Sequence, residues 1–77
     1  MEPFEISALV GNKMGRLTVV PQNNAQELSE YDVYLGSRKL ARIWTDFSIM
    51  GLEWHSADLI AEDTLRNIGL AIEGYDA

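Results

Sequence analysis

Three side chains that can transfer protons lie close together in the sequence: Glu53, His55 and Asp58. An imidazole beside two carboxylates is suited to general acid–base catalysis, and with a further ligand it is suited to metal binding. His55 is the only histidine, and Glu53 and His55, two residues apart on a strand, share a face opposite Leu52 and Trp54. A solvent-exposed polar pair explains this spacing more simply. We therefore predict no catalytic residue, metal site or cofactor, and keep a small enzyme that uses these three residues as an alternative.

The sequence contains none of the motifs that position a nucleophile or a phosphate. No serine stands in the Gly-x-Ser-x-Gly arrangement of a nucleophile elbow. No glycine-rich segment has the spacing of a phosphate loop or a dinucleotide fingerprint. The chain has no cysteine, which excludes disulfides and thiolate metal sites. These absences favour a function in binding over one in catalysis, and no small-molecule ligand is indicated.

Charge is distributed unevenly along the chain. The formal net charge is −6, and residues 1–42 carry five basic and five acidic side chains, whereas residues 43–77 carry one basic and seven acidic ones. Such a negative field repels a phosphate backbone, so it argues against a nucleic-acid partner. It also raises a second alternative, an acidic nucleic-acid mimic that inhibits a DNA- or RNA-handling protein. That alternative requires a row of carboxylates spaced like backbone phosphates.

Length and composition predict one small globular domain over residues 1–77. A domain usually has about 100–200 residues, and the 47% share of hydrophobic residues argues against disorder. No apolar run reaches the length of a signal peptide or the roughly 18 residues of a membrane helix. We therefore expect a cytoplasmic protein without a membrane partner.

The first residues have the two-residue alternation of a β-hairpin. Strands are predicted over residues 4–10 and 16–20, joined by a four-residue loop at residues 11–14 that places Ile6 opposite Val19. This register gives the hairpin one apolar face, because a slip of one residue would mix the two faces. The residues of that face are Phe4, Ile6, Ala8, Leu17 and Val19.

The rest of the chain continues this meander and then changes period. Strands are predicted at residues 31–35, 39–45 and 52–55, with a polar loop at 21–26 and a connection at 46–51. A helix is predicted over residues 61–75, because Leu65, Ile68, Ile72 and Tyr75 recur at helical spacing. Gly69 would lie on the buried side of this helix and allow close contact with the sheet.

The predicted fold class is therefore α+β, an antiparallel meander of four to five strands packed against one C-terminal helix. A two-residue loop at residues 36–37 or 37–38 puts Tyr31, Val33 and Leu35 on one face with Leu40, Arg42 and Trp44. Tyr34, Ala41 and Ile43 are then expected on the other face of the sheet, which the helix does not cover.

This arrangement leaves more apolar side chains than one helix can cover, and contiguous exposed apolar surface usually marks an interface. The sequence therefore favours a non-enzymatic protein-interaction module or a homo-oligomer such as a homodimer. Its partner would be another protein or a second copy of the chain. The candidate interface consists of Tyr34, Ala41 and Ile43.

Overall fold

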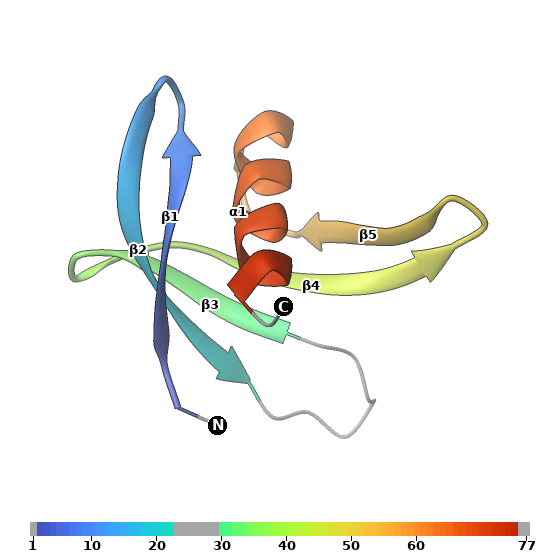
Figure 1. The fold of residues 1–77 in the computed structure, drawn as a ribbon, viewed down its shortest axis with the longest axis horizontal. Coiled ribbons are helices and arrows are strands. Elements are labelled where there is room, and N and C mark those ends of the chain that lie inside the picture. The colour runs from blue at the N-terminus through green and yellow to red at the C-terminus, as the bar shows by residue number, and fades with distance from the viewer. Residues whose placement is uncertain (1, 23–29, 76–77) are drawn as a thin grey trace.

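Five consecutive antiparallel strands form one curled sheet, and a single C-terminal helix packs against it (Figure 1). The computed structural model describes residues 2–22 and 30–75. The strands follow one another across the sheet in chain order, which confirms the predicted α+β meander. The elements are β1 (Phe4–Val10), β2 (Lys13–Gln22), β3 (Glu30–Leu35), β4 (Arg38–Ser48), β5 (Gly51–Ser56) and α1 (Glu62–Tyr75).

The hairpin of β1 and β2 has the predicted faces but not the predicted register. Its loop has two residues, Gly11 and Asn12, and Gly11 adopts a φ of 67°, which glycine tolerates without strain. Ile6 therefore pairs with Leu17 instead of Val19. The shift is two residues, so every side chain keeps its face, and the predicted apolar face is confirmed as part of the core.

Strand β2 is longer than predicted at its C-terminal end. Pro21 and Gln22 continue the strand and pair with Tyr31 and Glu30 of β3, although they were expected to begin a loop. The pairing of β2 with β1 ends at Val19, so Pro21 has a neighbouring strand on one side only, where a missing N–H is tolerated. The remainder of the predicted loop, residues 23–26, lies outside the described residues.

A β-bulge at Leu40 decides which side chains of β4 face the core. Tyr34 pairs with Lys39, but Val33 pairs with Ala41, so Leu40 has no partner in β3. One extra residue reverses the faces of all residues beyond it. Ala41 and Ile43 consequently lie in the core, 1% and 0% exposed. The prediction that placed them on the uncovered face was wrong, because it assumed unbroken alternation along β4.

Strand β4 continues through the segment that was predicted to be a connection. Among the described residues, β3 pairs with β4 only as far as Trp44, whereas β4 and β5 pair as far as Ser48 and Gly51. Residues 45–54 therefore form a two-stranded ribbon closed by a turn at Ile49 and Met50. We call this ribbon the arm. Figure 1 shows that the arm points away from the rest of the sheet.

Helix α1 supplies the other half of the core. Its buried residues are Thr64, Ile68, Gly69 and Ile72, so the buried stripe agrees with the prediction at Ile68 and Ile72. Leu65 is only partly buried, and Tyr75 is exposed but stacks on Phe4 with ring centroids 4.2 Å apart. No helix in the described part of the chain has the length and apolar character needed to cross a bilayer.

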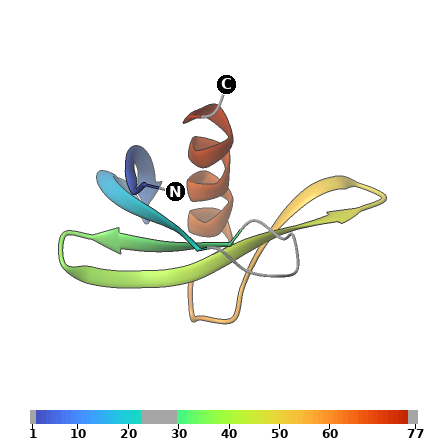
Figure 2. The same cartoon turned by 90° about the horizontal axis from the view of Figure 1, so that it is seen from below.

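The curl of the sheet brings both of its edge strands to α1, which packs against β1 and β5 (Figure 2). The side toward β5 is very close, because a Cβ atom at Gly69 would overlap the indole ring of Trp54. This contact confirms the close helix–sheet approach that a mid-helix glycine predicted. On the side toward β1, the Gly11 N–H donates to Thr64 Oγ1 at 3.4 Å and Asn67 Nδ2 donates to the Leu9 carbonyl at 3.5 Å.

Candidate functional site: the arm and the cleft beside α1

The structure places Glu53 and His55 on β5 and Asp58 in the turn that follows it. Glu53 and His55 lie on β5, opposite Asp46 and Trp44 of β4. The carboxylate of Asp58 accepts the backbone N–H of Arg42 at 2.8 Å and so fastens the chain after β5 to the sheet. No hydrogen bond or ion pair joins the three side chains. Within residues 2–22 and 30–75, no group of three His, Asp or Glu side chains could hold a metal ion.

Ser56 completes the anchorage of this turn. Its hydroxyl donates to the carbonyl of Arg42 at 2.8 Å and accepts the Asp58 N–H at 3.1 Å. Together with the bond from the Arg42 N–H, these contacts hold residues 56–58 against β4 before α1 begins. The polar residues around His55 are thus explained by the geometry of a turn, as local side chain–backbone bonding favours.

The outer face of the sheet, which α1 does not cover, is polar at its centre. The buried carboxylate of Asp32 accepts two bonds from Arg42, Nε to Oδ1 at 2.7 Å and Nη2 to Oδ2 at 3.0 Å. Gln22 Nε2 donates to the same carboxylate at 2.9 Å, and Lys39 Nζ lies 3.3 Å from it. The hydrogen bonds from Arg42 lower the pKa of Asp32 in spite of its burial, with Lys39 acting in the same direction. The same bonds raise the pKa of Arg42.

This network changes the predicted interface. Tyr34 flanks the network on the outer face, opposite Lys39, whereas Ala41 and Ile43 lie in the core. The three residues therefore do not form one surface. The two basic side chains nearest to Tyr34 are also paired with Asp32, which leaves little free positive charge on this face.

The aromatic residues between positions 31 and 54 are divided between the two faces. Tyr31 packs 5.8 Å from Trp54 and edge-on to Phe4, on the side of the core. The ring of Trp44 lies 6.2 Å from that of His55. Trp44 is on the outer face of the sheet, opposite to the face that carries Trp54. A single aromatic platform of the kind that stacks on single-stranded nucleic acid is therefore not formed by these residues.

Three of the four most exposed apolar side chains in the described residues lie on the arm, and the fourth, Leu59, lies between β5 and α1. Phe47 is 79% exposed, Ile49 is 103% exposed and Met50 is 86% exposed. Phe47 lies directly opposite Leu52, and directly opposed residues share a face, so these two side chains form one apolar pair. The sequence indicated a surplus of apolar residues here, but only the extension of β4 shows that they lie on a projecting ribbon.

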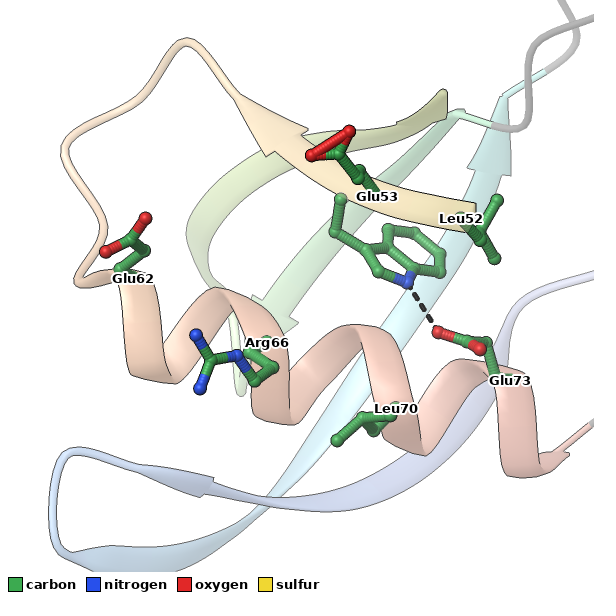
Figure 3. Close-up of a pocket in the computed structure, with 7 residues that line it drawn as sticks. Leu52, Glu53, Glu62, Arg66, Leu70 and Glu73 are labelled. Atoms are coloured by element: carbon green, nitrogen blue, oxygen red, sulfur yellow. Dashed lines mark hydrogen bonds between the residues drawn. The ribbon is translucent and has the colours of Figure 1, made fainter. Parts of the chain in front are cut away.

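A cleft of about 390 Å³ lies between β5 and α1, at the base of the arm (Figure 3). Trp54 contributes its ring and donates its indole N–H to Glu73 Oε2 at 2.7 Å. Figure 3 shows Leu52 and Glu53 on β5, with the Glu53 carboxylate directed away from α1, and Glu62, Arg66, Leu70 and Glu73 along the helix. The lining residues are Leu52, Glu53, Trp54, Glu62, Arg66, Leu70 and Glu73.

Sequence reasoning missed this cleft, although two of its signals were visible. Gly69 predicted a close approach of helix and sheet, and that approach is what seats Trp54 beside α1. Leu70 is not part of the apolar stripe predicted for the helix, and it is 58% exposed at the cleft. The missing information was how α1 packs beside β5, because that packing forms the cleft. Comparison with protein-family models, with curated proteins and with solved structures finds no match to this chain.

Proposed function

We propose that this protein is a non-enzymatic protein-interaction module whose contact surface is the apolar arm. The observation that supports this proposal is the exposure of Phe47, Ile49 and Met50 on one ribbon. An exposed apolar patch at one place on a small domain is typical of an interaction site. An isolated two-stranded ribbon is also only marginally stable in water, so a partner that covers the arm would stabilise it.

The core of the domain does not include these three side chains. The core consists of residues from β1 to β4 and from α1, and none of Phe47, Ile49 and Met50 belongs to it. Their removal should therefore leave the folded domain intact while it removes the contact surface. This separation makes the proposal testable with simple substitutions.

The acidic half of the chain gives little support to a nucleic-acid mimic. Glu62 and Glu73 both line the cleft, but Arg66 and Leu70 lie between them along the helix. A positive and an apolar side chain interrupt the row where a mimic needs further carboxylates. The small-enzyme alternative has no converging residues to support it, since Asp58 is bound to the backbone of Arg42.

Photo-crosslinking from the arm tests the proposal. A photoreactive amino acid at Met50 should give a discrete crosslinked product in extracts of the native host, whether the partner is another protein or a second copy. The same amino acid at Ser7, an exposed residue of β1, is the matched control and should give none. The product should disappear when Phe47 and Ile49 are both changed to Ser. Equal labelling from Met50 and Ser7, or no product from either, contradicts the proposal.

A further inference from the structure

We infer that the cleft between β5 and α1 binds an extended, cationic segment of a partner protein, with an apolar side chain in the cleft and Lys or Arg side chains against its rim. This inference rests on the proposed function, because the cleft lies at the base of the arm and the inference says which kind of partner would bind there. It is carried by three features of the cleft: its apolar lining, its charge and the open edge of β5.

The apolar lining is continuous with the arm. Leu52, Trp54 and Leu70 line the cleft, and Leu52 lies opposite Phe47 on the adjacent strand. A partner segment that lies along β5 would therefore meet the apolar side chains of Leu52 and Trp54. Recognition of this kind uses pockets for alternate side chains of an extended peptide.

The charge around the cleft is negative. Glu62 and Glu73 line it from the helix together with a single basic residue, Arg66, and Glu53 lies at the edge of the cleft with its carboxylate on the other face of β5 (Figure 3). Glu53 also lies directly opposite Asp46, and like charges in this position are destabilising. No ion pair joins either carboxylate to a Lys or Arg of the described residues. A cationic side chain supplied by a partner would relieve this repulsion and complement the rim.

The free edge of β5 provides backbone groups for an extended segment. On the opposite edge of the sheet, side chains of α1 bond to the Gly11 N–H and the Leu9 carbonyl. In the described residues, no such side chain bonds to the backbone of β5 outside its pairing with β4. Every second residue of an edge strand directs its N–H and C=O groups outward, where another strand can pair with them.

A second copy of this chain is the weaker occupant. In a two-fold symmetric dimer the same patch faces itself, so Glu62 and Glu73 at the cleft and Glu53 beside it would meet the same acidic residues of the second copy. Like-charge juxtaposition across an interface disfavours association. The charge therefore favours a different, basic partner over self-association through this cleft.

Selection of short random peptides displayed on phage tests the inference. The wild-type protein should enrich peptides that combine one large apolar residue with two or more Lys or Arg residues. Binding of a synthetic enriched peptide is then followed by fluorescence in a Trp44→Phe variant, in which Trp54 is the only tryptophan. Its emission should change on titration, and raising the salt concentration should weaken binding.

Two charge reversals with the same change in net charge locate the site. Glu53→Lys should weaken peptide binding about tenfold, because it places a positive charge beside the strand edge that the peptide would follow. Glu5→Lys on β1 is the matched control and should leave affinity within about twofold, since Glu5 contacts only Arg16 in an exposed pair. Circular dichroism confirms that both variants are folded.

The outcomes separate this inference from the proposed function. Enrichment of acidic or neutral peptides, equal loss of affinity in both variants, or no enrichment overturns the cationic ligand. A dimer of the wild-type protein that buries Trp54 and persists at high salt overturns it in favour of a second copy. In each of these cases a crosslink from Met50 that is absent from Ser7 still supports the proposed function.

Discussion

The two edge strands of the sheet, β1 and β5, differ in how the rest of the chain contacts them. At the β1 edge, α1 bonds to the strand through Thr64 and Asn67, and Phe4 stacks on Tyr75. At the β5 edge, the helix contacts Trp54, but the strand then leaves the body of the protein with β4 as the arm. One edge is closed by the fold, and the other remains available.

The comparison shows where the apolar residues of a small domain are used. A 77-residue chain has little surface to bury, yet it leaves Phe47, Ile49 and Met50 outside its core. Proteins usually protect an open edge strand from pairing with other chains by placing charged side chains on it or by covering it. Here one edge is covered and the other carries Asp46 and Glu53 beside exposed apolar residues, which is the combination expected of a selective contact surface.

Truncation of one isoleucine in each region gives the largest contrast. Ile43→Ala in the core should lower the free energy of unfolding by about 3 kcal/mol, because it removes buried methyl groups and leaves a cavity. Ile49→Ala on the arm should change it by less than about 0.5 kcal/mol. Urea denaturation followed by circular dichroism measures both. If Ile43→Ala proves too unstable to study, Ile43→Val should lower stability by about 1 kcal/mol. Similar losses at both positions would mean that the arm belongs to the core.

The two glycines of α1 test the close side of the helix. Gly69→Ala should destabilise the fold by about 2 kcal/mol, since the added methyl group overlaps the Trp54 ring and outweighs the gain in helix propensity. Gly74→Ala is the matched control, because open space surrounds it, and it should be neutral or stabilising by up to about 1 kcal/mol. Thermal unfolding of both variants distinguishes them. A stabilising Gly69→Ala would show that Trp54 moves aside freely.

The Asp32 network predicts that the stability of the fold depends on pH. The pKa of Asp32 is lowered in the folded protein, so its ionised form stabilises the fold above the unfolded pKa of about 3.9, and this contribution is lost as the pH falls through the folded pKa. Asp32→Asn should therefore destabilise by about 1–2 kcal/mol at pH 7, and its difference from wild type should shrink below about pH 4. Asp46→Asn should not destabilise, because it removes a like charge opposite Glu53. A constant difference between wild type and Asp32→Asn across this pH range would contradict the assignment.

Local patterns were sufficient to predict the elements and most of their faces. Alternation from Phe4 to Ala8 and helical spacing at Ile68 and Ile72 predict which side chains are buried. They do so because the repeat within one strand or helix determines which of its side chains share a face. The bulge at Leu40 has no such local signal. It depends on how β4 meets β3, where it turns both Lys39 and Arg42 toward Asp32.

The candidate site was predicted less well than the fold. Exposed apolar surface was expected, but Ala41 and Ile43 were assigned to it instead of Phe47 and Ile49. The error follows from the same bulge and from the length of β4, and both depend on contacts between segments. The cleft at Trp54 depends on the packing of α1 against β5. The pattern of either segment alone does not reveal that packing.

The stacking of Phe4 on Tyr75 has a practical consequence for the use of this domain. Because these rings lie 4.2 Å apart, the first residue of β1 and the last residue of α1 lie near each other. A domain with adjacent entry and exit points can be inserted into a surface loop of a host protein without forcing the host apart. Such a graft would display the ribbon of residues 45–54 on a carrier of choice, with both tethers on the terminal strand and helix.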